Sequence, residues 1–199
     1  MLLVAVPSYT GMLVVRVDAP ARAGLGIDTT RARAEQVRAY VAGTPGAALP
    51  ETLDDGRPAF DEKAVSHLDD VRTVLSGARV ATAVAALAAL LWIAVTLVTR
   101  KDRALAFSLM AAAWAVAAVV VVAALAALLD FARFFEAFHA LFFEAGTWQF
   151  AGDALLIRLF PEPFWAISGA VWGVLALAGA AILGASSRLV RSRLVRQEA

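Results

Sequence analysis

Three long apolar runs constrain this chain more than any other feature of its sequence. They cover residues 80–98, 104–129 and 166–185, and a helix needs roughly 20 apolar residues to cross a bilayer. Hydrophobic residues make up 61% of the 199 residues, whereas soluble domains are usually about half apolar. The sequence therefore predicts a mainly α, polytopic membrane protein with three full transmembrane helices.

The apolar runs divide the chain into segments of different character. A first membrane segment, truncated or short, and a small extracytoplasmic α+β region precede the first full run. The expected segments are the short first membrane segment (1–15), the extracytoplasmic region with a stem helix (16–77), three transmembrane helices (78–99, 104–129 and 166–187), an extracytoplasmic aromatic loop (130–165) and a basic cytoplasmic tail (188–199).

The N-terminal run from Met1 to Val15 is interrupted by polar residues and is too short to cross a bilayer comfortably. It lacks the basic start and the small-residue cleavage site of a signal peptide. We interpret it as the tail of a first membrane helix. For Tyr9 to Val17 the alternative is a buried strand or helix of the outer region, and the β-branched residues there favour a strand.

The region between residues 16 and 77 is too polar to lie in lipid. A loop is marked by Pro20, Gly24 and Gly26. Asp28 or Thr29 is expected to cap a helix that ends near Val41, before Gly43. A turn at residues 54–56 is expected to have short strands on either side. A long helix should then begin near Asp61 and run to about Thr99.

Basic residues set the expected orientation in the membrane. Short loops rich in Lys and Arg stay in the cytoplasm, which places the loop 100–103 and the tail 188–199 inside. The two regions that contain the only histidines, His67 and His139, then face outward together. We therefore predict that the two imidazoles meet at one face of a membrane.

Charge and cysteine content exclude several classes of function. The formal net charge is only +1, so no affinity for nucleic acid is implied. The chain has no cysteine, which excludes thiol nucleophiles, disulfides and thiolate metal sites.

The loop before the last apolar run is the most aromatic part of the chain. Phenylalanines recur there at helical spacing, at positions 131, 134, 135, 138 and 142. They predict a short helix with one aromatic face in the headgroup layer, and Trp148 and Trp165 are expected as interfacial anchors. His139 lies on this helix, either as a structural residue bonded to a backbone carbonyl or as part of a site shared with His67.

Two blocks of residues resemble a bacterial integral-membrane family whose characterised members are lipoprotein intramolecular transacylases. The first block is Phe60, Glu62, His67, Asp70 and Val71. The second is Phe138, His139, Phe142, Phe143, Trp148, Phe150, Asp153, Leu156, Ile157, Leu159, Phe160, Pro161, Glu162, Phe164 and Trp165. The chain departs from the family pattern at the first span, most of which is absent, and at Ala64, where members often carry an acidic residue.

The resemblance implies an acyltransferase that acts on bacterial lipoproteins. The family reaction moves the sn-2 acyl chain of a diacylglyceryl-cysteine to the α-amine of the same cysteine and gives the lyso-form. The family's histidines fall on His67 and His139. The implied partners are diacylglyceryl lipoproteins and membrane lipid, with no cofactor and no metal. The implied location is the bacterial cytoplasmic membrane, with the active site on the extracytoplasmic face.

We assign provisional roles from this chemistry. His67 is taken as the general base and His139 as the acid or oxyanion stabiliser, although the reverse assignment stays open. Supporting carboxylates are expected at Asp70, Glu62 and Glu136. Substrate contacts are expected from Phe138, Phe142, Phe143, Trp148, Arg158 and Glu162, although Arg158 and Glu162 could instead pair with one another.

Two other functions remain open at this point. His67, Asp70 and His139 offer nitrogen and oxygen ligands suited to zinc, as in a metal-binding membrane hydrolase. A non-enzymatic membrane scaffold or sensor is the second alternative. A serine nucleophile is not expected, because Ser66 should point away from its neighbour His67 on a helix.

Overall fold

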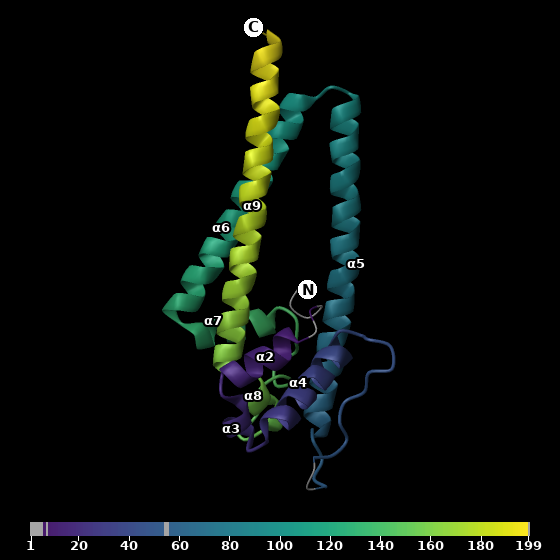
Figure 1. Cartoon of the computed structure of the whole chain (residues 1–199), viewed down its shortest axis with the longest axis vertical. Coiled ribbons are helices and arrows are strands. Elements are labelled where there is room, and N and C mark those ends of the chain that lie inside the picture. Colours follow the sequence, from purple (N-terminus) through teal and green to yellow (C-terminus); the bar gives the residue numbers. More distant parts are fainter. Residues whose placement is uncertain (1–5, 7, 54–55, 199) are drawn as a thin grey trace. The chain divides into compact units, whose positions relative to one another are not determined.

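The structure is a computed structural model that describes residue 6, residues 8–53 and residues 56–198, with only the backbone from residue 195 onward. Within these residues the chain is mainly helical (Figure 1). The helices are α2 (Tyr9–Arg16), α3 (Ala19–Ala23), α4 (Ile27–Val41), α5 (Glu62–Val98), α6 (Asp102–Leu129), α7 (Phe131–Ala140), α8 (Leu155–Leu159) and α9 (Glu162–Glu198).

The chain divides into two compact units. The first contains the residues before 81 together with 135–168, and the second contains 81–134 together with the residues after 168. The long helices α5 and α9 contribute their N-terminal parts to the first unit and their apolar parts to the second.

The second unit contains the three apolar runs. α5, α6 and α9 are long and apolar enough to cross a membrane, as the sequence predicted. Their large side chains are mostly exposed, and Leu128 and Leu129 have 83% and 86% of their surface accessible. Such a continuous apolar surface needs a lipid environment rather than water.

Small residues bring α6 and α9 close together in this unit. A Cβ placed on Gly173 would lie 3.5 Å from Val120, and one on Gly184 would lie 4.0 Å from Ala113. The Ser187 hydroxyl donates a 2.6 Å hydrogen bond to the Ala106 carbonyl and is fully buried. Close backbone approach and hydrogen bonds between helices are the usual means of helix packing in lipid.

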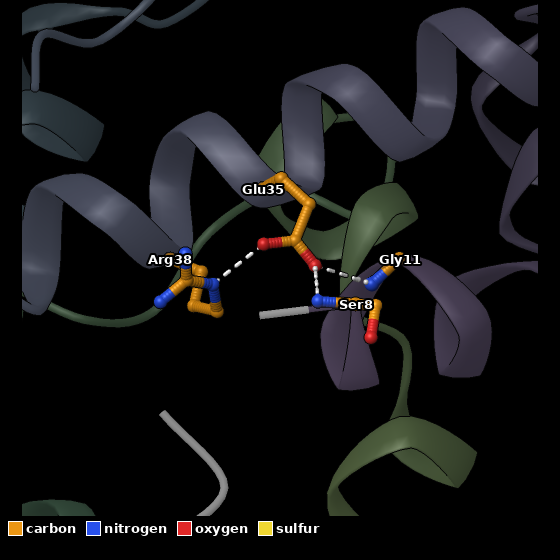
Figure 2. Close-up of polar contacts among 4 residues, drawn as sticks. All are labelled: Ser8, Gly11, Glu35 and Arg38. Atoms are coloured by element: carbon orange, nitrogen blue, oxygen red, sulfur yellow. Dashed lines mark hydrogen bonds and ion pairs between the residues drawn. The ribbon is translucent and has the colours of Figure 1, made fainter. Parts of the chain in front are cut away.

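The first unit has its own hydrophobic core, which includes Leu13, Val37 and Leu159. Helix α2 lies against α4, and Glu35 of α4 holds its N-terminus (Figure 2). One Glu35 carboxylate oxygen accepts hydrogen bonds from the backbone N–H groups of Ser8 at 3.1 Å and Gly11 at 2.9 Å. The other accepts from Arg38 Nε at 2.5 Å. A carboxylate at this position accepts hydrogen bonds from N–H groups that have no partner within the helix, and its negative charge interacts favourably with the helix dipole.

The prediction of an α+β region is wrong. The described residues contain no strand, and the segment around the turn at 54–56, part of which lies outside the described residues, has a single β-bridge between Thr52 and Pro58. Hydrogen bonds run from Leu53 N to Arg57 O at 2.8 Å and from Ala59 N to Glu51 O at 3.0 Å. Pro58 has no N–H group to extend the ladder.

The preference for a strand between Tyr9 and Val17 is also wrong. This segment is helix α2, whose Leu13 and Val14 are buried in the core of the first unit. Packing and the Glu35 carboxylate outweigh the weak strand preference of β-branched residues. Residues 1–5 and 7 of the predicted first membrane segment lie outside the described residues, and α2 is not among the helices suited to cross a membrane in the described part.

Two details of the next segment also differ from expectation. The loop predicted around Pro20 contains the short helix α3, with Pro20 in its first turn. The N-cap of α4 is Gly26 rather than Asp28 or Thr29, and the Thr30 hydroxyl donates to the Gly26 carbonyl at 2.9 Å. The predicted end is confirmed, because α4 stops at Val41 and Gly43 follows with a φ of +66°.

The start of α5 carries His67 and is fixed in place by a capping residue and by the core of the first unit. The Asp61 carboxylate accepts a 2.7 Å hydrogen bond from the Ala64 N–H group, as expected for a residue that caps this helix. Ala64 and Leu68 are buried in the core of the first unit. His67 follows Ala64 by three residues, so it shares this inward face of α5, and it is buried as well.

Candidate active site

The two histidines are neighbours within the first unit. His67 lies near the start of α5 and His139 near the end of α7. Their ring centroids are 6.3 Å apart and their planes are inclined by 29°. Two imidazoles from distant parts of the sequence therefore share one site.

The His67 ring is almost completely enclosed. Only 8% of the residue is exposed, and its Nδ1 atom is buried without a hydrogen-bond partner among the described residues. Burial is the largest of the causes that together lower the pKa of His67 to about 4; the neighbouring His139 and Lys63 act in the same direction, and the Asp70 carboxylate opposes them. His67 is therefore a neutral imidazole at neutral pH.

His139 has one ring nitrogen fixed by the backbone. Its Nδ1 lies 2.8 Å from the carbonyl oxygen of Phe135, one turn earlier in α7. A carbonyl oxygen only accepts hydrogen bonds, so Nδ1 carries the proton, and in the neutral ring the lone pair lies on Nε2. Burial lowers the pKa of His139, and the bond to Phe135 partly opposes that shift.

Aromatic rings surround both imidazoles. The Phe143 ring contacts both, with centroid distances of 4.9 Å to His67 and 5.7 Å to His139. Phe150 lies 5.5 Å from His67, and Trp148 lies 4.8 Å from His139. We call these rings, with Phe135 at 4.0 Å and Phe138 at 5.7 Å from His139, the aromatic cluster. It keeps the site apolar.

The loop that carries part of the aromatic cluster is tied to α5. Lys63, one helical turn before His67, donates a 2.5 Å hydrogen bond from Nζ to the Gln149 carbonyl. The same ammonium group lies 5.2 Å from the centre of the Phe150 ring. The turn at Gly146, with a φ of +91°, is closed by a 2.9 Å bond from its N–H group to the Gln149 side chain. These contacts fix Trp148 and Phe150 beside the histidines.

Comparison with known families identifies the class of protein. The family model described as lipoprotein intramolecular transacylase Lit matches residues 8–165, which include both histidines and the aromatic cluster. This chain belongs to the Lit family. A search of curated proteins and a search of solved structures found no match.

Three carboxylates predicted to support the histidines of this Lit family member lie outside the aromatic cluster. Asp70 is exposed and affects His67 through its charge, but the described residues include no hydrogen bond between them. Glu62 and Glu136 are exposed on α5 and α7. Within the described residues, no group of three or more His, Asp or Glu side chains is arranged to hold a metal ion, so the proposed zinc ligands do not form a set.

The six residues predicted to contact substrate fall into two places. Phe143 and Trp148 belong to the aromatic cluster with Phe138, and Phe142 packs 5.2 Å from Phe138. Phe138 and Phe142 are each 48% exposed. Arg158 and Glu162 instead line a separate cavity of about 470 Å³ with Arg22.

Sequence reasoning assigned no role in the site to three residues near the histidines. Lys63 lies four positions before His67 and so shares its helix face, a spacing that could have indicated it. Phe135 was noted only as part of the aromatic face, yet its carbonyl orients His139. Phe150 was part of the family resemblance without a role, and its contact with His67 depends on how the loop folds.

Proposed function

We propose that this Lit family member moves the sn-2 acyl chain of a diacylglyceryl-cysteine lipoprotein to the α-amine of the same cysteine. The observation that carries the proposal is the pair of neighbouring imidazoles inside the aromatic cluster. Both rings are held neutral by burial, which suits them to exchange protons with a reacting amine and alcohol.

His139 is the general base in this proposal, which reverses the provisional assignment made from sequence. Its Nδ1 proton is held by the Phe135 carbonyl, so the Nε2 lone pair is the one that can take a proton. The resulting imidazolium stays hydrogen-bonded to that carbonyl. The pKa of His67 is lowered to about 4, well below the ordinary histidine value, so this ring is a weak proton acceptor at neutral pH.

The reaction then proceeds in two steps. The neutral α-amine forms a bond to the ester carbonyl carbon, and one of its protons passes to His139 Nε2. The intermediate collapses when the bond from that carbon to the sn-2 glycerol oxygen breaks, and the proton on His139 passes to this oxygen. Neutral His67 donates a hydrogen bond from its ring N–H group to the departing oxygen. The products are an amide and a free hydroxyl group, and no co-reactant is consumed.

The apolar surroundings favour transfer over hydrolysis. Amine and ester belong to one molecule, so positioning alone can lower the barrier by on the order of 7 kcal/mol. The aromatic cluster encloses the imidazoles and limits the entry of water. The exposed rings of Phe138 and Phe142 give the acyl chain an apolar surface next to His139.

Mass spectrometry of lipoprotein N-termini tests the proposal directly. Cells that lack the activity would express the wild type, His67→Ala or His139→Ala. Wild type should produce N-acyl lyso-lipoprotein, whereas each variant should reduce the product by about 10²-fold or more, the usual contribution of a proton-transferring side chain. Membrane levels of each protein would be measured in the same cells.

Ser66→Ala is the matched control, because Ser66 is exposed and adjoins His67 on α5. It should retain wild-type product. Wild-type cells that yield only diacyl lipoprotein would refute the proposal. If the effects of the wild-type protein on the cell persist in both histidine variants, the scaffold or sensor alternative is supported instead. Loss of wild-type activity in the presence of a chelator would support the metal-dependent alternative.

A further inference from the structure

Trp148 carries a polar atom that the mechanism above does not use. Its indole Nε1 is buried, and no hydrogen-bond partner for it lies among the described residues. A buried indole N–H group normally has a partner, because leaving it without one costs about 1–3 kcal/mol. An unsatisfied donor of this kind in a candidate active site suggests a partner that arrives with the substrate.

The position of Trp148 relates this donor to the reacting groups. Its ring lies over the His139 ring, with a centroid distance of 4.8 Å and an angle of 31°. His139 is the residue whose Nε2 is free to receive the amine proton. An ester carbonyl attacked by an amine next to this nitrogen would therefore lie close to the Trp148 ring.

The indole is also held in place before substrate binds. The bond from Lys63 to the Gln149 carbonyl and the turn at Gly146 fix the loop on both sides of Trp148. A donor that is positioned in advance, in surroundings poor in water, stabilises charge without reorganising during the reaction.

We propose that Trp148 Nε1–H donates a hydrogen bond to the carbonyl oxygen of the sn-2 ester and stabilises the negative charge that this oxygen gains. The inference rests on the proposed acyl transfer. No proton moves from the indole. When the amine attacks, the carbonyl π electrons move to the oxygen, and the hydrogen bond from the indole N–H group to that oxygen becomes stronger. When the sn-2 oxygen leaves, these electrons re-form the carbonyl double bond.

The test replaces Trp148 with 3-benzothienylalanine, which keeps the size and stacking of the ring but has sulfur in place of the N–H group. Full-length protein in detergent would be assayed with a synthetic diacylglyceryl-cysteine lipopeptide. We expect kcat to fall by about 10²–10³-fold with little change in KM, as when one oxyanion donor is removed. Trp148→Phe should show the same loss in kcat.

The matched control is the same replacement at Trp165, in the same unit. Its indole Nε1 already donates a 2.9 Å hydrogen bond to the Phe160 carbonyl, so its N–H group is used within the protein. This variant should keep the wild-type kcat. Equal kcat for the wild type and the Trp148 analogue would overturn the inference, as would a rise in KM with kcat unchanged.

A binding measurement covers the case in which the Trp148 variants fold poorly. In ¹⁵N-indole-labelled wild type, a phosphonate analogue of the tetrahedral intermediate should move the Trp148 N–H proton signal downfield. Such analogues occupy the transition-state geometry, and a hydrogen bond to their charged oxygen deshields the indole proton. An unmoved signal with the analogue bound would contradict the inference. Wild-type protein that forms no lyso-product with the lipopeptide would instead refute the underlying acyl transfer.

Discussion

At the scale of single residues, the site depends on burial rather than on carboxylate partners. His67 is nearly enclosed, and His139 bonds to the backbone carbonyl of Phe135. The Asp70 carboxylate is exposed and raises the pKa of His67 less than burial lowers it. The spacing between His67 and Asp70 suggested a carboxylate that orients the ring, but spacing along a helix does not reveal which side chains the rest of the fold covers.

The lowered pKa values predict how acyl transfer responds to acid. The reacting amine must be neutral, and an α-amine has a pKa of about 7.7–8.0. The logarithm of the rate should therefore rise with a slope of one per pH unit below about pH 8. Burial depresses the pKa values of both histidines, so their neutral forms persist in more acidic solution. A second unit of slope, from protonation of the histidines, should begin only below the ordinary histidine pKa of about 6.5. Rates measured between pH 4 and 9 show where it begins.

Folding stability gives an independent check on the same pKa. In the unfolded chain His67 would titrate at about 6.5, whereas its pKa in the folded protein is about 4. Between these values the unfolded state binds a proton that the folded state excludes, so the free energy of unfolding falls as the pH is lowered. His67→Phe removes this contribution and should flatten the dependence. An unfolding free energy, measured by denaturant titration, that falls equally in wild type and His67→Phe between pH 6.5 and 4 would contradict the expected burial.

At the scale of elements, the length of the apolar runs predicted the long helices, and the spacing of phenylalanines predicted α7, but neither signal identified the short helices α2 and α3. The apolar runs that form α5, α6 and α9 are long enough to predict membrane-spanning helices. Helix α2 has only eight residues, and its β-branched side chains favoured a strand. It forms a helix because it packs against α4 and receives the Glu35 carboxylate at its N-terminus, two contacts that lie 24 or more residues away in sequence.

Replacement of Glu35 tests this dependence. Glu35→Ala leaves the N–H groups of Ser8 and Gly11 without their acceptor and should lower the free energy of unfolding by about 2 kcal/mol. Glu35→Gln keeps an oxygen acceptor and loses only the negative charge opposite Arg38 and at the helix N-terminus, so it should cost less, about 1 kcal/mol. Thermal unfolding in detergent measures both. Equal stability of Glu35→Ala and wild type would show that α2 does not need this contact.

At the scale of the whole molecule, the sequence predicted that the two histidines would be on one side of the membrane but could not predict how they would meet. Their 6.3 Å separation brings the start of α5 next to the end of α7. The loop that follows α7 is tied to α5 by the hydrogen bond from Lys63 to the Gln149 backbone carbonyl. The sequence of residue types does not reveal a hydrogen bond to a backbone carbonyl group. The indole donor of Trp148 was missed for a related reason, because only the folded chain shows that it lacks a partner.

The orientation in the membrane is a property of the whole chain. Basic residues in the loop 100–103 and in the C-terminal part of α9 favour the cytoplasm. The first unit, with both histidines, should then face outward. The absence of cysteine allows a clean test, because Ala48→Cys and Ser192→Cys each introduce a single exposed thiol. Ala48→Cys should react with a membrane-impermeant maleimide in intact spheroplasts, whereas Ser192→Cys should react only after lysis. The opposite pattern would place the histidines in the cytoplasm, where the lipoprotein substrate proposed here is not exposed.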